Sequence, residues 1–148
     1  MIKYEGLDCI LLIDDDTPTN FLHSIIIKRA GIDAIVQTHT SAIDALAYLT
    51  STGPYEGKKM IQPGIIFLDI NMPAMNGWDF LDEYGKLPEE QKAKITIIML
   101  TTSLNPSDRE RAESYEDVVT YLHKPLILKN LQELIATYFK PILTIENL

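Results

Sequence analysis

Charged and hydroxyl side chains stand at the ends of four apolar runs of this chain. The unbroken runs CILLI and IIFL are typical of strands buried on both faces of a parallel sheet, and ITIIML and VVTYL resemble them. The carboxyl ends of parallel strands lie along one edge of a sheet, where open α/β proteins bind ligands, so we expect these polar residues to meet there. They are Asp14, Asp15, Asp69, Thr101 and Lys124.

Asp69 taken alone would also fit an ordinary turn after a strand. Several carboxylates brought to one edge repel one another, however, so such a site needs raised pKa values or a bound cation. A small set of hard oxygen ligands favours Mg²⁺, which keeps several waters and commonly bridges carboxylate to phosphate. The hydroxyl of Thr101 and the ammonium of Lys124 suit phosphoryl oxygens. Phosphoryl transfer is catalysed largely by positioning and charge neutralisation, so these residues predict a phosphoryl-transfer site.

The strands that must position these residues alternate with helical segments. This alternation predicts an α/β domain with a parallel sheet joined by right-handed crossovers. A loop rich in glycine and proline, Gly53 to Gly64, precedes the central strand. The predicted strands are Cys9 to Ile13, Ala34 to Val36, Ile65 to Leu68, Ile95 to Leu100 and Val118 to Leu122.

Helix boundaries can be predicted from capping residues. Thr17 is the expected N-cap of the first helix, with Pro18 at the first helical position and Gly31 as its C-terminal stop. In that helix Phe21, Leu22, Ile25, Ile26 and Ala30 recur at helical spacing. The later helices are expected after Ser41, from about Asn76 to Lys86, after Asn105 or Ser107, and from Ile127 to Phe139, where Pro141 follows.

Length and charge limit the classes of function. With 148 residues and 46% hydrophobic content, the chain fits a single domain, residues 1–148, with a core of about 7–139 and a short tail. The net charge of −8 opposes binding to nucleic acid and to anionic membranes. Cys9 lies in an apolar run and is expected in the core. No apolar stretch approaches the roughly 20 residues that span a bilayer, so we expect a soluble cytoplasmic protein.

Four fragments in this order, ILLIDDD, LDINMPAMNGWDFL, IIMLTTS and YLHKP, carry a resemblance to a known family. Each fragment alone is weak, but together at these intervals they are highly specific. Over about residues 7–139 the sequence resembles a response-regulator receiver domain, similar to the chemotaxis response regulator. This resemblance implies a flavodoxin-like, doubly wound (βα)5 fold with strand order 2-1-3-4-5.

The resemblance also implies roles for individual residues. Asp69 would be the phosphoacceptor, Asp14 and Asp15 would help to bind Mg²⁺, and Thr101 and Lys124 would contact the phosphoryl group. Further matches are Asn71, whose backbone carbonyl would ligate the metal, Tyr121, whose rotamer would change with the threonine, and Pro125, which would follow a cis peptide bond.

Two features depart from the family pattern. Asp16 extends the usual acidic pair to three, and we read it as a loop charge or helix cap in preference to a ligand, so which two aspartates bind the metal stays open. Before YLHKP the family carries small residues ending in Gly-Ala. Residues 116–120 are EDVVT instead, which predicts a differently shaped turn before the fifth strand.

Two other classes share parts of this pattern. A haloacid-dehalogenase-like phosphatase needs a second aspartate two residues after its nucleophile, where this chain has Asn71. In that class the acidic pair also follows the lysine in sequence, whereas here Asp14 and Asp15 precede Lys124. A flavodoxin needs a hydroxyl- and glycine-rich phosphate loop after the first strand, where this chain has DDDTPTN. The sequence therefore favours a phosphorylation-controlled signalling switch over a turnover enzyme.

The same reading predicts partners. The phosphoryl donor would be a histidine kinase or a histidine phosphotransfer protein. Only nine residues follow Phe139, so we expect output by protein docking. The alternatives are onward phosphotransfer to a histidine phosphotransfer protein, direct binding to a downstream target, and homodimerisation. An aromatic beside a basic residue is typical of a binding hot spot, which favours docking by the face that carries Tyr121 and Lys124.

Overall fold

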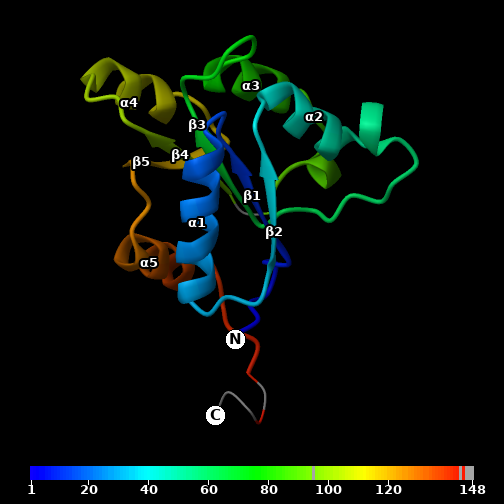
Figure 1. Cartoon of the computed structure of the whole chain (residues 1–148), viewed down its shortest axis with the longest axis vertical. Coiled ribbons are helices and arrows are strands. Elements are labelled where there is room, and N and C mark those ends of the chain that lie inside the picture. The colour runs from blue at the N-terminus through cyan, green and yellow to red at the C-terminus, as the bar shows by residue number, and fades with distance from the viewer. Residues whose placement is uncertain (95, 144, 146–148) are drawn as a thin grey trace.

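Five parallel strands form the centre of the molecule in the order β2-β1-β3-β4-β5 (Figure 1). The computed structural model describes residues 1–94, 96–143 and 145. The flavodoxin-like order expected from the resemblance is confirmed. The strands are β1 Cys9–Ile13, β2 Ile35–His39, β3 Ile65–Asp69, β4 Thr96–Thr101 and β5 Val118–His123.

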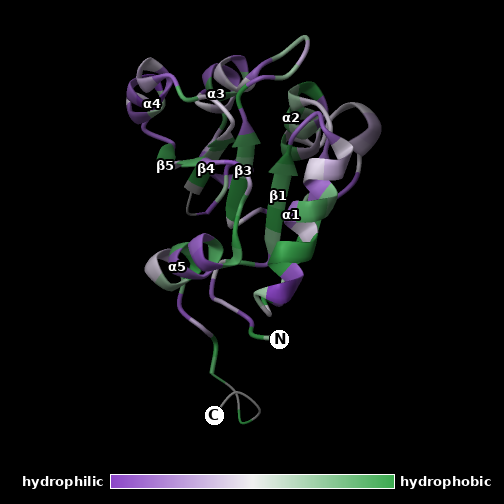
Figure 2. Ribbon diagram, turned by 60° about the vertical axis from the view of Figure 1, so that its left-hand side comes forward, coloured by the Kyte–Doolittle hydropathy of each residue, from purple (hydrophilic) through white to green (hydrophobic). Residues whose placement is uncertain are grey.

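Helices cover both faces of the sheet, and this explains the unbroken apolar runs. Every residue of β1 and β3 is buried, and Figure 2 shows both strands as hydrophobic while α4 is mostly hydrophilic. One apolar core joins the sheet to α2, α3 and α4, and a second core joins it to α1 and α5. The helices are α1 Thr17–Arg29, α2 Ala42–Thr50, α3 Gly77–Tyr84, α4 Pro106–Glu113 and α5 Leu128–Tyr138.

The N-cap of α1 is Asp16, so the prediction of Thr17 was wrong. The Asp16 carboxylate accepts a hydrogen bond of 3.1 Å from the backbone of Thr19. A carboxylate both satisfies a free amide and interacts favourably with the positive end of the helix dipole, which explains why it takes this position. The cap predicted at Ser41 is confirmed, Asn76 caps α3 at the predicted start of that helix, and α4 is capped by Asn105 rather than by Ser107.

The apolar residues that predicted α1 do not all form its buried face. The side chains of Phe21 and Leu22 are 64% and 58% exposed, whereas Asn20, His23 and Ile27 are buried. Two polar residues therefore take positions on the face that packs against the sheet. Such burial is tolerated only where polar groups find hydrogen-bond partners.

Strand β2 begins one residue later and ends three residues later than predicted, because pairing and not hydropathy sets its length. It pairs with all five residues of β1, from Cys9–Ile35 to Ile13–His39.

In the pairing of β4 with β5 the register shifts between Ile97 and Ile98, close to the turn that departs from the family pattern. The predicted start of the fourth strand, Ile95, lies outside the described residues. Within the described part of the chain, no helix has both the length and the apolar character needed to cross a membrane.

Gly77 allows α3 to start close to the end of β3. A Cβ atom at this position would lie 2.5 Å from the carbonyl oxygen of Asp69 and 2.9 Å from Cα of Ile70. Both contacts are with backbone, which cannot turn aside as a flexible side chain can. The absence of a side chain at Gly77 therefore fixes the position of α3 beside Asp69.

We expect Gly77→Ala to lower the free energy of unfolding by about 1–3 kcal/mol, because the added methyl group must push the backbone apart. The matched control is Gly85→Ala, where the nearest atom to the new Cβ lies at 3.4 Å and the backbone is helical. That variant should change stability by less than about 1 kcal/mol. Urea denaturation followed by circular dichroism measures both, and equal stabilities of the two variants would contradict the argument.

Candidate functional site

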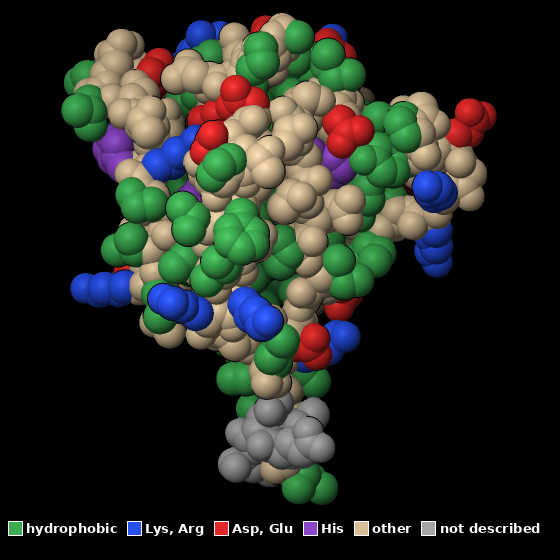
Figure 3. Space-filling view, viewed as in Figure 1, with side chains coloured by type: hydrophobic (Ala, Val, Ile, Leu, Met, Phe, Trp, Pro, Cys, Tyr) green, Lys and Arg blue, Asp and Glu red, His purple; other side chains and the backbone are tan. Residues whose placement is uncertain are grey.

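Three carboxylates meet at the carboxyl edge of the sheet, as the sequence predicted. Asp14 and Asp15 follow β1, and Asp69 is the last residue of β3, the strand beside it. One carboxylate oxygen from each lies within 4.8 Å of the others. Figure 3 shows acidic side chains gathered above the upper end of α1. The sheet order creates this cluster, because β1 and β3 are neighbours although more than fifty residues separate Asp14 from Asp69.

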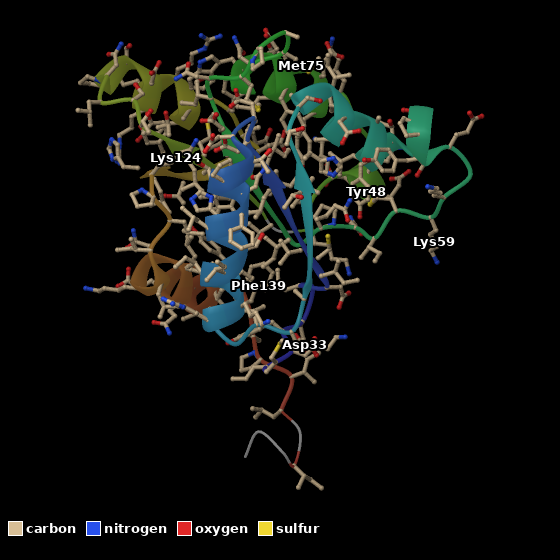
Figure 4. All side chains as sticks on the ribbon, in the orientation of Figure 1. Asp33, Tyr48, Lys59, Met75, Lys124 and Phe139 are labelled. Carbon is tan, nitrogen blue, oxygen red and sulfur yellow. The ribbon has the colours of Figure 1, made fainter. Side chains whose placement is uncertain are left out.

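Lys124 places a positive charge against this cluster. Its ammonium nitrogen lies 3.0 Å from Oδ1 of Asp69 and also contacts Oδ2 of Asp14. The backbone N–H of Lys124 donates to the carbonyl of Thr101 at 2.8 Å, which holds the residue beside the end of β4. The peptide bond between Lys124 and Pro125 is cis, as expected. Lys124 thus bridges two carboxylates from separate strands, and Figure 4 shows it at the end of the sheet opposite Asp33.

Burial makes the charges of the site interact strongly. Asp14 and Asp69 are 4% and 6% exposed. Burial raises the pKa of Asp69, the hydrogen bond from Lys124 opposes this rise, and the charge of Asp14 adds to it. Burial alone would lower the pKa of Lys124, but its hydrogen bonds to Asp14 and Asp69 outweigh burial and raise it. The site therefore holds a lysine that stays charged beside a carboxyl group, that of Asp69, whose ionised form is disfavoured by burial.

The hydroxyl of Thr101 lies at the same edge, and Asn71 lies beyond it. Thr101 is fully buried at the end of β4, and its Oγ1 accepts a hydrogen bond of 3.0 Å from the backbone of Ser103. Asn71 is exposed, two residues after Asp69, in the loop that leads to α3. The structure thus brings Lys124 into contact with Asp14 and Asp69, places an oxygen of Asp15 within 4.8 Å of theirs, and sets Thr101 on the neighbouring strand end.

Tyr121 points into the molecule from β5. It is 6% exposed, and its hydroxyl is buried without a hydrogen-bond partner among the described residues. The guanidinium of Arg109 lies 5.4 Å from the ring centroid and covers it from α4. In this conformation Tyr121 is therefore buried, and the side chain of Lys124 is only 14% exposed. The exposed residue between them is His123, whose ring is 5.9 Å from that of Tyr121.

Asp16 is not part of the acidic cluster. Its carboxylate caps α1 through Thr19, which agrees with its interpretation as a cap in preference to a ligand. Asn20 and His23 beside the site, and Arg109 over Tyr121, were not predicted from the sequence as residues of the site. Asn20 and His23 lie on one helical stripe with Ile27, but hydropathy favours the burial of Phe21 and Leu22 over that of two polar side chains. Nothing in the sequence pattern singles out Arg109.

The donor set fits a hard divalent cation. Three carboxylates that share a small volume repel one another, and bound positive charge relieves that repulsion. Mg²⁺, Ca²⁺ and Mn²⁺ all bind oxygen ligands such as carboxylates. Two of the three aspartates of the cluster are buried. Asp14, Asp15 and Asp69 could therefore hold a metal ion. Two of these residues, Asp14 and Asp69, also contact the ammonium of Lys124.

Comparisons with known proteins give the same family. The profile described as response regulator receiver domain matches residues 10–136. The chain is 32% identical over 127 residues to response regulator Rcp1 of Synechocystis sp.. The aligned region covers 85% of this chain and 82% of Rcp1.

Solved structures with the same fold are response regulators as well. A two-component response regulator from Cytophaga hutchinsonii is 35% identical with a TM-score of 0.73, covering 88% of this chain and 96% of the other. The Mn²⁺-bound form of Rcp1 is 29% identical with a TM-score of 0.69, covering 88% and 90%. With the sheet order and the acidic edge, these matches show that the chain belongs to the family of response-regulator receiver domains of two-component systems.

Proposed function

We propose that this chain is a phosphorylation-controlled switch in which Asp69 accepts a phosphoryl group. The observation that carries the proposal is the position of the Asp69 carboxylate. It lies 3.0 Å from the Lys124 ammonium, and an oxygen of it lies within 4.8 Å of oxygens of Asp14 and Asp15. A nucleophile, a fixed positive charge and a set of metal ligands are the parts that phosphoryl transfer requires.

The donor we propose is a phosphohistidine of a histidine kinase or a histidine phosphotransfer protein. A carboxylate oxygen of Asp69 attacks the phosphorus, the N–P bond breaks, and its electron pair returns to the imidazole nitrogen of the donor. The ammonium of Lys124, which contacts both Asp69 and Asp14, would also contact the transferred phosphoryl oxygens. The Thr101 hydroxyl can donate to another of these oxygens.

We propose that Mg²⁺ is bound by Asp14, Asp15, Asp69 and the backbone carbonyl of Asn71. When bound, Mg²⁺ supplies positive charge that offsets the charge on the phosphoryl oxygens. The protein groups do the positioning, since burial and the Lys124 contact hold the Asp69 carboxylate at the strand end.

A phosphatase of the haloacid-dehalogenase type remains the weaker alternative. It would need a general acid two residues beyond Asp69, and the amide of Asn71 cannot supply a proton at that position. A flavin phosphate at the first loop would face Asp14 and Asp15, whose charges repel it. Receiver-domain response regulators are signalling proteins rather than turnover enzymes, and the proposed chemistry ends with the acyl phosphate and its hydrolysis.

For output we propose that Thr101 moves toward the phosphoryl group and that Tyr121 changes rotamer in response. The partner would be a downstream protein or a second copy of this chain, docked on the face formed by α4, β5 and α5. His123 is exposed on this face, whereas Tyr121 and Lys124 are buried or partly buried in the present conformation. A partner must bind the two states with different affinity, because equal affinity shifts nothing.

Replacement of the acceptor tests the first step. We expect Asp69→Asn to abolish labelling by acetyl phosphate in the presence of Mg²⁺, because the amide is not a nucleophile. Intact-protein mass spectrometry detects the added phosphoryl group. The matched control is Asp33→Asn at the far end of the sheet, which should be labelled like wild type (Figure 4). Labelling of Asp69→Asn at the wild-type level would refute the assignment.

Removal of a ligand tests the metal. We expect Mg²⁺ to raise the free energy of unfolding of the wild-type chain by about 2.7 kcal/mol at one hundred times its Kd, because it binds only the folded cluster. Asp15→Ala should lose most of this increment, whereas Asp33→Ala should keep it. Differential scanning fluorimetry over a Mg²⁺ series measures the effect. An equal melting shift in Asp15→Ala and wild type would argue against the ligand set.

Replacement of the hydroxyl tests the coupling. We expect Thr101→Ala to accept phosphate but to transmit less of the change to Tyr121, because the methyl group makes no hydrogen bond to the phosphoryl oxygens. The control is Thr102→Ala, because Thr102 is the neighbouring residue in the chain and is exposed. NMR spectra with labelled tyrosine report the response at Tyr121. Full wild-type shift changes in phosphorylated Thr101→Ala would exclude this coupling.

A further inference from the structure

Helix α1 turns two polar side chains toward the acidic site. Asn20 and His23 are three residues apart, so they lie on the same face of the helix, and they are only 4% and 3% exposed. Neither belongs to the set of residues that the proposed function uses. Buried polar groups on a helix face are costly unless they make specific hydrogen bonds, so their contacts show what they do.

Asn20 holds the backbone of Asp14. Its Nδ2 donates to the carbonyl of Asp14 at 2.9 Å and more weakly to the carbonyl of His39 at 3.4 Å. The backbone N–H of Asp14 also donates to His39, at 3.1 Å. The side-chain amide therefore joins the ends of β1 and β2 at the residue whose carboxylate enters the acidic cluster. A flipped amide would set an oxygen against two carbonyl oxygens, so the donors fix its orientation.

His23 holds the chain after Lys124. Its Nε2 accepts a hydrogen bond of 3.4 Å from the backbone N–H of Leu126, two residues beyond Lys124. Burial lowers the pKa of His23, which keeps the imidazole neutral and leaves a lone pair on Nε2 for this contact. Leu126 is itself buried in the core between the sheet, α1 and α5. The segment that carries Lys124 is thus attached to α1 on one side and to Thr101 on the other.

The two side chains also line a small space under the site. A cavity of about 10 Å³, enough for one water, lies between them and the residues Asp14 and Asp69. Oδ1 of Asn20 is buried and has no partner among the described residues. Since Nδ2 faces the two carbonyls, Oδ1 faces away from them. The floor of the site is therefore polar, although the strands around it are apolar.

We propose that Asn20 and His23 are positioning residues for phosphoryl transfer, Asn20 acting through Asp14 and His23 through Lys124. The inference rests on the proposed function, because it names the groups that hold its machinery. It assigns separate tasks to the two side chains. Asn20 sets the affinity for the metal, because it fixes the backbone of a ligand, and His23 sets the rate at saturating metal, because it fixes the segment that carries the ammonium.

Two substitutions of similar volume separate these tasks. Asn20→Leu should raise the Mg²⁺ concentration for half-maximal phosphorylation about tenfold and leave the maximal rate less affected, as removal of an outer hydrogen bond to a metal ligand does. His23→Leu should lower the maximal rate about tenfold, because a small displacement of a catalytic group has effects of this size, and leave the Mg²⁺ dependence unchanged. Initial rates of labelling by acetyl phosphate over a Mg²⁺ series measure both quantities.

Controls separate positioning from a general loss of structure. Asn130→Leu makes the same substitution on α5, away from the acidic edge, and should behave like wild type in both quantities. His23→Gln keeps an acceptor for the Leu126 N–H and should restore most of the rate that His23→Leu loses. Circular dichroism sets the assay temperature at which every variant is folded. A purely structural role would lower the melting temperature without moving metal affinity and rate separately.

A calorimetric titration of Mg²⁺ onto the unphosphorylated chain gives a second readout. If Asn20→Leu binds Mg²⁺ as tightly as wild type, or if folded His23→Leu reaches the wild-type maximal rate, the inference is overturned. A wild-type chain that binds Mg²⁺ but is never phosphorylated would instead refute the proposed function, and the titration of Asn20→Leu would still decide the role of Asn20. The inference is supported if Asn20→Leu binds Mg²⁺ more weakly and His23→Leu has a slower maximal rate that His23→Gln restores.

Discussion

The repulsion between buried carboxylates is the constraint on which this structure depends. Asp14 and Asp69 are almost fully buried, and the ammonium of Lys124 contacts both. One positive charge cannot balance the two together with the nearby Asp15. The cluster therefore favours the binding of further positive charge, and this is what a site for a metal ion requires. A pair of carboxylates whose charge was fully neutralised would be more stable but would attract a cation less strongly.

Such a site contributes little to stability, so the rest of the fold must hold it in place. Buried ion pairs lose much of their attraction to desolvation, and removal of one partner leaves an uncompensated charge. The stabilising contribution comes from the two apolar cores on either face of the sheet. Parallel pairing fixes the ends of β1 and β3 relative to each other, and Gly77 sets α3 directly against the end of β3. The polar edge thus depends on apolar packing some distance below it.

The sequence predicted the parts of this arrangement that follow from regular patterns. Unbroken apolar runs located the strands, and their polar ends located the acidic edge and Lys124, because parallel strands share one direction. It could not predict that Asn20 and His23 would be buried while Phe21 is exposed, because their burial depends on hydrogen bonds to Asp14 and to Leu126. These partners are distant in sequence or belong to the backbone. The length of β2 was missed for a similar reason, since its polar end is specified by pairing with β1.

Tyr121 is the residue that would form the two-state element of the proposed switch. Its hydroxyl is buried without a partner among the described residues, which costs the inward rotamer about 1–3 kcal/mol relative to a hydrogen-bonded one. The guanidinium of Arg109 lies over the ring and offsets about 0.5–2 kcal/mol of this cost. In the proposed switch, two opposing contributions of similar size would leave a small free-energy difference between the rotamers, which a local charge change could reverse. In the proposed switch, the movement of Thr101 therefore needs to contribute only a modest difference in free energy, because the buried hydroxyl already weakens the inward state.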